Sequence, residues 1–225
     1  SCVQRAANEV NGTALILVYA DGDNSIAVYP GAGEGLTAAH VASAANMINR
    51  SKVVMASCEV PLPATQAAFV LARQAGAMTL LNPAPAIDLP DDLWPLIDVL
   101  TPNEEELFNL APYQTKDLNV AAHQLLQKGV GAVVVTLGEK GCALFRPGQT
   151  VHRVPGHSVT VKDTIGAGDT FTGALAANLS QGIPWEASLR LANAAAALST
   201  QAHGAVSAMP FKQQVDAWLT TIMAA

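Results

Sequence analysis

The sequence is poor in charge, and its few positive charges are dispersed. Charged residues make up 13% of the 225 residues, about half of the roughly 25% that an average soluble domain carries. Lys and Arg number 12 against 18 Asp and Glu, which gives a formal net charge of −6. Nucleic acid is therefore excluded as a partner, because its phosphates need clustered positive charge. Small anionic ligands remain compatible with the sequence, since a few local donors can hold them.

Cysteines and long apolar runs are also scarce. Cys2, Cys58 and Cys142 are too few and too scattered for a disulfide framework or a zinc site. We expect them to be small thiols in a reducing cytoplasm. The longest apolar runs, such as 14–20, fall short of the ~20 residues that span a bilayer, and the first ten residues show no signal-peptide pattern. The sequence predicts a cytoplasmic protein without a membrane partner.

Signatures of several other enzyme classes are absent. The sequence has no Gly-x-x-x-x-Gly-Lys-Ser/Thr motif, which excludes a P-loop kinase. It has no Gly-x-Gly-x-x-Gly between a strand and a helix near its start, which argues against a nicotinamide-dependent oxidoreductase. The five histidines form no pair at metal-ligand spacing, and nearly all of them are expected to be exposed or on helix faces.

Apolar segments of strand length alternate with segments of helical period along the chain. This alternation predicts one α/β domain over residues 1–225, with a parallel sheet and helices on both faces. The expected strands are 13–20, 25–29, 52–58, 78–81, 97–100, 132–137 and a hairpin of 141–145 with 151–154. A turn at 21–24 joins the first two. The expected helices are 37–49, 63–76, 104–110, 117–128, 168–181, 185–201 and 211–223, and the glycine-rich segment 31–35 is expected to be a loop.

The most informative segment is 163–171, Asp-Thr-Ile-Gly-Ala-Gly-Asp-Thr-Phe, which leads into an expected helix. Gly166, Ala167 and Gly168 carry little or no side chain, so their backbone N–H groups can approach a ligand closely. The free N–H groups and the positive dipole end of the helix form an anion site. Asp169 would stay ionised there and could receive a proton from a hydroxyl that attacks phosphorus. The alternative interpretation is an acidic helix cap after a flexible turn.

This segment is similar to the C-terminal signature of the ribokinase-type (PfkB) carbohydrate kinases. Other segments resemble the same family in the same order over essentially the whole chain: Glu59 before Pro61, the runs 81–85, 101–106 and 136–141, and the stretch 192–210. The run 81–86 and the alanine-rich helix are most similar to the ribokinase branch. The resemblance implies a Rossmann-like sheet sandwiched by helices. It also implies an ATP-dependent kinase that phosphorylates the 5-hydroxyl of ribose or a related pentose.

The resemblance assigns roles to the residues of the anion site. Asp169 would be the base for the sugar hydroxyl, and the amides of 166–168 would hold the charge on the transferred phosphoryl group. Asn103 and Glu106 lie three residues apart on one face of a helix start. In the family this pair helps to place Mg²⁺ through water, whereas the sequence alone favours an N-cap with an acidic first turn.

Other positions match the nucleotide and sugar contacts of the family. Thr136, Gly138, Glu139 and Gly141 follow the strongest expected strand and match the nucleotide-binding turn. A simple β-turn would use the same glycines. Asn193 matches a position near the nucleotide.

Two further positions match a sugar contact and a nucleotide-base contact of the family. Glu59 matches a sugar-contacting position, although a lone Glu after a strand is usually just solvated. His203 lies where the nucleotide base would pass.

The resemblance also implies a monovalent cation, usually K⁺, beside the anion site. A carboxylate and several backbone carbonyls would hold it, at positions matching Asp163, Ile165, Ser199, Ala202, Gly204 and Ala208. Ribokinase-like sequences commonly offer a hydroxyl at the last position. Ser207 is adjacent to Ala208 and could compensate.

The N-terminal part of the family domain has no match here. That part carries a glycine-rich sugar-binding motif, an Asp that grips sugar hydroxyls and half of a lid. Strands 13–20 and 25–29 match the remaining lid strands, so the chain is expected to be N-terminally truncated. An open sheet edge and exposed apolar surface should follow. Lid strands of this kind imply a homodimer for the intact protein.

Two alternative functions stay open. A sister kinase on the same scaffold would act on fructose, 2-keto-3-deoxygluconate or a nucleoside. A non-catalytic module would bind the nucleotide without transferring a phosphoryl group. The missing N-terminal region favours the second alternative, and the intact Asp169 argues against it.

Overall fold

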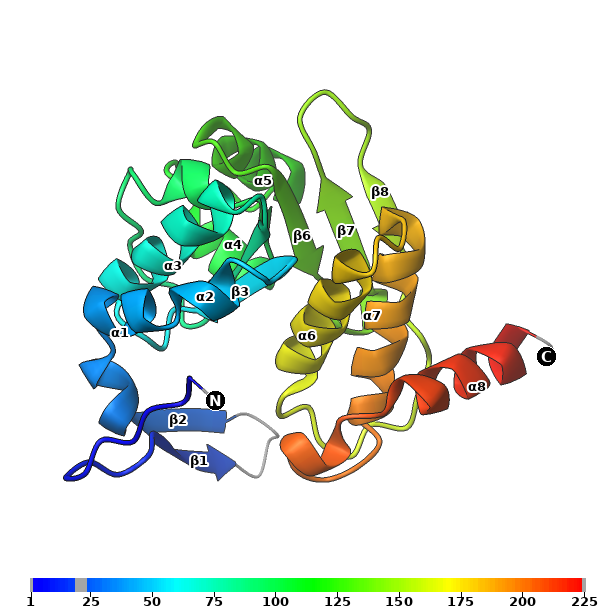
Figure 1. Ribbon diagram of the computed structural model, residues 1–225. Coiled ribbons are helices and arrows are strands. Elements are labelled where there is room, and N and C mark those ends of the chain that lie inside the picture. Colours follow the sequence, from blue (N-terminus) through cyan, green and yellow to red (C-terminus); the bar gives the residue numbers. More distant parts are fainter. Residues whose placement is uncertain (1, 19–23, 224–225) are drawn as a thin grey trace.

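The computed structural model describes residues 2–18 and 24–223, which form two separate sheets and their covering helices (Figure 1). The smaller sheet is an antiparallel hairpin of β1 (Thr13–Val18) and β2 (Asn24–Tyr29). The turn expected at 21–24 lies outside the described residues, except for Asn24. The larger sheet contains six strands: β3 (Val53–Ser57), β4 (Met78–Asn82), β5 (Val99–Leu100), β6 (Ala132–Thr136), β7 (Cys142–Phe145) and β8 (His152–Val154).

The six strands follow one another in sequence order across the larger sheet. β3 to β6 are parallel, and β6, β7 and β8 are antiparallel to their neighbours. The expected parallel sheet is thus confirmed, with the expected β7–β8 hairpin added at one end. Parallel strands require crossover connections, and the helices between β3 and β6 supply them.

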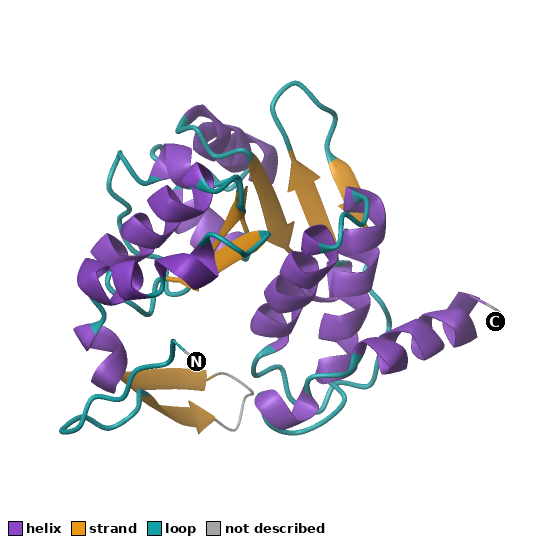
Figure 2. Cartoon of the chain, in the orientation of Figure 1, coloured by secondary structure: helices purple, strands orange, loops and turns teal. Residues whose placement is uncertain are grey.

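Helices cover both faces of the larger sheet, as expected (Figures 1 and 2). One face carries α3 (Leu62–Gln74), α4 (Glu104–Leu110) and α5 (Leu118–Gln127), which bury Phe69, Leu107 and Leu125 against it. The other face carries α6 (Ala167–Ser180) and α7 (Trp185–Ser199), which bury Phe171 and Leu189. The C-terminal helix α8 (Lys212–Met223) packs on the outside of α7.

Two predictions for the N-terminal third are wrong. The single helix expected at 37–49 is broken at Ala44, whose φ of −96° and ψ of 5° leave the helical region, into α1 (Ala38–Ser43) and α2 (Ala45–Ile48). The bend lets Val41 and Ile48 both join the buried cluster under α3. The glycine-rich segment expected to be a loop forms a short 3-10 helix, Gly31–Gly35. Other 3-10 turns are Trp94–Leu96, Gly138–Lys140 and Val206–Ala208.

The hairpin and β3 leave apolar surface uncovered. β3 pairs only with β4 among the described residues, and the side chain of Met55 is 48% exposed. On the hairpin, Leu15, Leu17 and Val28 are at least half exposed. The structure thus has the open sheet edge and the exposed apolar surface expected from the sequence. In the described parts of the chain, no helix has both the length and the apolar character needed to cross a bilayer.

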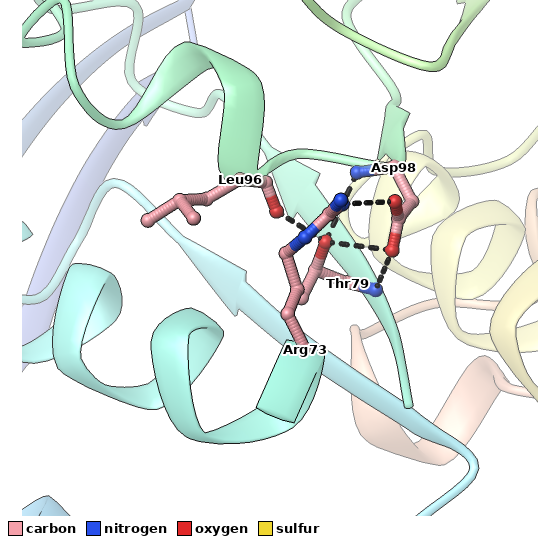
Figure 3. A network of polar contacts seen from close by, with 4 residues as sticks. All are labelled: Arg73, Thr79, Leu96 and Asp98. Carbon is pink, nitrogen blue, oxygen red and sulfur yellow. Dashed lines mark hydrogen bonds and ion pairs between the residues drawn. The ribbon is translucent and has the colours of Figure 1, made fainter. Parts of the chain in front are cut away.

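A polar network locks the amino ends of β4 and β5 together (Figure 3). The carboxylate of Asp98 accepts from the backbone N–H of Thr79 at 2.9 Å and pairs with the guanidinium of Arg73 on α3. The Thr79 hydroxyl donates to the carbonyl of Leu96 and accepts from the backbone N–H of Asp98. These bonds satisfy the polar groups at the amino ends of these strands. The carboxyl ends, on the opposite side, remain available for ligands.

Candidate active site

The carboxyl ends of the parallel strands bring several of the predicted site residues to one edge. β3 leads into Glu59, β5 into Asn103, and β6 ends at Thr136. Asn103 and Thr136 are joined by an isolated parallel bridge, and the N–H of Thr136 donates to the carbonyl of Pro102 at 2.9 Å. In open α/β sheets, ligands bind outside the carboxyl ends of the strands. This edge is therefore the expected place for chemistry.

Helix α6 begins over the same edge, and its first turn is built from small residues. Gly166 caps the helix at a φ of +74°, a left-handed conformation that favours glycine. Gly168 differs, because its φ is ordinary and an added Cβ would meet nothing within 4 Å. Neither backbone conformation nor packing within the protein explains a glycine at 168. Its bare backbone instead leaves the helix N-terminus open to a ligand.

A buried hydroxyl pair fixes α6 against the sheet. The hydroxyls of Thr101, at the end of β5, and Thr172, on α6, lie 3.2 Å apart, and both side chains are buried. Within α6, the Thr170 hydroxyl donates to the carbonyl of Gly166 at 2.8 Å. These bonds hold the first turn of α6 at a defined position beside the strand ends.

Two carboxylates, those of Asp169 and Glu106, lie near each other at this edge. Asp169 is exposed in the first turn of α6. Glu106 and Asn103 form a reciprocal capping box at the start of α4, with both hydrogen bonds at 2.8 Å. Burial raises the pKa of Glu106, the Asn103 N–H opposes this shift, and the negative charges of Glu105 and Asp169 raise it further. Asn103 and Glu106 therefore form the N-cap with an acidic first turn that the sequence alone favours.

Glu59 lies at the same edge, beside a buried thiol. Its carboxylate accepts from the hydroxyl of Ser57 at 3.0 Å, and the residue is exposed. Burial first, and then the charges of Glu106 and Glu59, raise the pKa of Cys58 to about 11. Cys58 is therefore a neutral packing residue. Because the charges of Glu59 and Glu106 both act on its thiol, these two carboxylates lie near one another.

A cavity of about 600 Å³ opens next to the start of α6. Its polar walls come mainly from the turn after β6 and from the residues before α6, and its apolar walls from 159–161, α6 and α7. The predicted residues among its lining are Thr136, Gly138, Glu139, Gly141, Ala167, Gly168 and Asn193. A volume of this size suits a small-molecule ligand, with an anionic end at the α6 N-terminus and a flat apolar end between the other walls.

The remaining predicted residues lie outside this cavity. Asn103, Glu106, Gly166, Asp169 and His203 do not line it. The histidine in the wall is His157 instead.

Sequence reasoning missed most of the apolar walls of the cavity. They include Val159, Val161, Phe171, Ala196 and Ala197. The α7 part of this wall could have been predicted from the sequence. Positions 193, 196, 197 and 200 recur at the spacing of one helix face, and Asn193 is already expected near the nucleotide.

The residues predicted for a cation come from two loops that the structure holds together. The carboxylate of Asp163 accepts from the N–H of Ile165 and from the N–H of Gly204, both at 2.9 Å. These two bonds lower the pKa of Asp163. The hydroxyl of Ser207 donates to the carbonyl of His203, and Ala208 is buried. No group of three or more His, Cys, Asp or Glu among residues 2–18 and 24–223 is arranged to hold a metal ion.

Comparisons with known proteins agree with this arrangement. The model of the pfkB family of carbohydrate kinases matches residues 1–212. A ribokinase of Staphylococcus aureus is 36% identical over 220 residues, which are 96% of this chain and 72% of that protein. A mouse ribokinase is 36% identical over 211 residues, which cover 91% of this chain and 65% of that protein. The chain thus spans about two thirds of the length of these relatives.

A solved structure gives the same result for the fold. Arabidopsis thaliana ribokinase, whose structure holds ribose and ATP, superposes with a TM-score of 0.86 at 31% sequence identity. The match covers 93% of this chain and 69% of that chain.

Proposed function

The chain belongs to the pfkB family of carbohydrate kinases, and we propose that it transfers the γ-phosphoryl group of ATP to the 5-hydroxyl of ribose or a related pentose. The observation that carries this proposal is the cavity at the N-terminus of α6. Asp169 directly follows Gly168, a lining residue, in the first turn of this helix. A nucleotide in the cavity would present its terminal phosphate to the same edge at which Asp169, Glu59 and Glu106 meet.

The cavity suits ATP at both of its ends. The N–H groups of the first turn of α6 would bind the phosphates, the open space at Gly168 allows close approach, and the turn at 138–141 would contact the rest of the nucleotide. The apolar walls formed by Val159, Ala196 and Ala197 would hold the base. Lys140 adds a positive side chain to the lining. The structure of a relative that holds ATP supports ATP as the nucleotide.

Asp169 would act as the general base. Its place in the first turn of α6 keeps it near the positive end of the helix dipole. The sugar hydroxyl gives its proton to this carboxylate while its oxygen attacks the γ-phosphorus, and ADP leaves with the electrons of the broken bond. The N–H groups of Ala167 and Gly168 would stabilise the charge on the transferred group.

Two metal ions fit the chemistry of the donors at this edge. Oε2 of Glu106 is used in the capping box, so Oε1 can accept from the water of a bound Mg²⁺, which keeps several waters in such sites. When bound, Mg²⁺ neutralises charge on the phosphates. One carboxylate, Asp163, with the carbonyls of Ile165, Ser199, Ala202 and Gly204 fits a monovalent cation such as K⁺, and Ala208 supplies only its backbone.

The relatives and Glu59 indicate that a sugar is the phosphoryl acceptor. Ribokinases are the similar proteins, and the exposed carboxylate of Glu59 could accept from a sugar hydroxyl. Fructose, 2-keto-3-deoxygluconate and nucleosides are the competing acceptors, since kinases for them would share the nucleotide side of the site.

A partner and a location complete the proposal. The exposed apolar face of the hairpin would pair with a second copy, giving a homodimer through the lid strands. Three unpaired cysteines, two of them buried, suit a reducing cytoplasm.

ADP release measured over a panel of sugars tests the function. We expect that ribose or deoxyribose gives the largest kcat/KM and that Asp169→Asn lowers turnover by about 10²–10⁴-fold. If ATP binds but no sugar is phosphorylated, the chain is a nucleotide-binding module, the second candidate that the exposed sugar side of the molecule favours. If ATP does not bind, both proposals are wrong.

A further inference from the structure

His157 lies in the wall of the cavity, in the segment 156–159 that follows β8. The side-chain amide nitrogen of Asn193 on α7 donates to the carbonyl of Pro155 at 2.7 Å. This bond joins two segments that are 38 residues apart and fixes the wall to the middle of α7. His157 is thus held at a definite place in the cavity.

That place is the end of the cavity remote from the anion site. The carbonyl of Thr200 accepts from the N–H groups of Lys162 and Asp163, so this end of α7 lies beside the loop that leads into α6. Seven residues separate Asn193 from Thr200, which is about 10 Å along a helix at 1.5 Å per residue. With phosphates at the α6 N-terminus, the wall beside Asn193 is where the base would lie.

Trp218 of α8 holds the His157 ring from outside. The two ring centroids are 4.9 Å apart, and the planes make an angle of 70°, an edge-on arrangement. α8 lies beside α7 on the side away from β3 (Figure 1). Val215 and Leu219 pack against α7, whereas Trp218 also reaches the cavity wall. α8 is thereby connected to a cavity that none of its own residues lines.

The His157 ring is suited to pack against a flat, uncharged surface. Burial, and to a smaller degree the charge of Arg190 on α7, lower the pKa of His157. The ring is therefore neutral at neutral pH, and burying a neutral ring against a base costs little. The neighbouring lining residues Val159, Ala196 and Ala197 are apolar.

We propose that the ring of His157 packs against the base of the bound nucleotide, and that Trp218 is a positioning residue that sets the orientation of this ring. The inference rests on the proposed function, because it takes the ligand of the cavity to be ATP. It adds a base contact and a role for α8 that the motif residues do not provide.

Calorimetric titration of the full chain with Mg-ATP and with inorganic tripolyphosphate, which lacks a base, tests the contact. His157→Ala should weaken ATP about tenfold, the usual effect of losing one base-stacking ring, and leave tripolyphosphate unchanged. His157→Phe, which keeps a flat ring against Trp218, should stay within about threefold of the original affinity. The matched control is His123→Ala, since His123 makes a similar edge-on contact with Phe145 but does not line the cavity.

Trp218 is tested in the same titrations. Trp218→Ala should reproduce the loss of ATP affinity, and the double variant with His157→Ala should lose no more than either single change. Trp218→Phe should restore affinity. Leu219→Ala, which removes an α8 contact with α7 but not the contact with His157, controls for loss of helix packing.

The outcomes separate this inference from the function beneath it. If wild-type chain does not bind ATP, the proposed function fails and the inference with it. If wild-type chain binds ATP and His157→Ala changes the affinities for ATP and tripolyphosphate by the same factor, or His157→Phe weakens ATP binding as much as His157→Ala does, the base contact is wrong. If the effects of His157→Ala and Trp218→Ala add, Trp218 is not a positioning residue.

Discussion

The two sides of the sheet's carboxyl edge differ in how completely they are enclosed. The nucleotide side, formed by β6–β8, α6 and α7, surrounds a cavity of about 600 Å³. The acceptor side, formed by β1, β2, β3 and Glu59, has an exposed carboxylate, an unpaired edge of β3 among the described residues, and apolar side chains in solvent.

The difference separates binding from transfer. Binding a nucleotide as proposed would require only the enclosed side, whose walls are fixed by bonds such as Asn193 to Pro155 and Thr101 to Thr172. Transfer also requires an acceptor held in line with the γ-phosphate and shielded from water. The effects of mutations should therefore fall into two groups.

The largest effect is expected at Asp169, where the two sides meet. Asp169→Asn should lower ATP-dependent sugar phosphorylation by about 10²–10⁴-fold, the usual contribution of a general base. ATP affinity should change little, because Asp169 does not line the cavity. Steady-state turnover and calorimetry measure the two quantities. Glu186→Gln, which alters an acidic residue in the first turn of α7, is the matched control, and equal losses in both variants would contradict the assignment.

The second effect concerns the stability of the two sheets. When the chain is dilute enough to be monomeric, amides of the β1–β2 hairpin should exchange with deuterium at least about a hundredfold faster than those of β6, because a two-stranded sheet is only marginally stable alone. The side chains of Ala132–Val135 in β6 are buried, whereas Leu15, Leu17 and Val28 of the hairpin are exposed. Exchange followed by mass spectrometry gives the rates. Equal protection would mean that a partner covers the hairpin in solution, as in the proposed homodimer.

The third effect is a separation of stability from binding at Gly168. Gly168→Ala should raise the free energy of unfolding by about 0.4–1 kcal/mol, since the added Cβ meets nothing and the unfolded chain loses freedom. The same methyl group should lower ATP affinity about tenfold, which corresponds to about 1.4 kcal/mol, by blocking phosphate approach. Gly173→Ala, in the same helix and also in open space, should only stabilise. Unchanged affinity in Gly168→Ala would place the phosphates elsewhere.

The smallest effect is a loss of stability in acid at Asp163. Its pKa in the folded protein is lowered from the ordinary 3.8 by the N–H groups of Gly204 and Ile165. Above pH 3.8 the contribution of the carboxylate to stability is fully present, and it is lost as the pH falls through the folded value. Urea midpoints of wild type and Asp163→Asn should therefore converge below pH 3.8. A constant difference down to pH 2 would show that the two bonds do not carry this contribution.

The parts of the fold that could be predicted from sequence are those set by local pattern. Apolar runs such as 132–137 predicted the parallel strands, among them β6 at Ala132–Thr136, and the small residues at 166–168 predicted the start of α6. These features depend on residues that are close together in the chain, so composition and spacing suffice.

The parts that could not be predicted depend on long-range contacts. The break at Ala44 follows from packing of Val41 and Ile48 on α3. His157 enters the wall of the cavity because Asn193, 38 residues away from Pro155, fixes that segment, and because α8 brings Trp218 against it. No local spacing relates residues 157, 193 and 218, so the sequence could not place His157 in this wall.

Photoaffinity labelling with 8-azido-ATP tests most directly the claim that the enclosed side is the nucleotide site. The full chain is irradiated with the probe and Mg²⁺, with and without excess ATP, and the labelled peptides are identified by mass spectrometry. The account predicts labels in 156–161 and 193–200 that excess ATP removes. Protected labels on the hairpin or on α3, with none in those two segments, would contradict it.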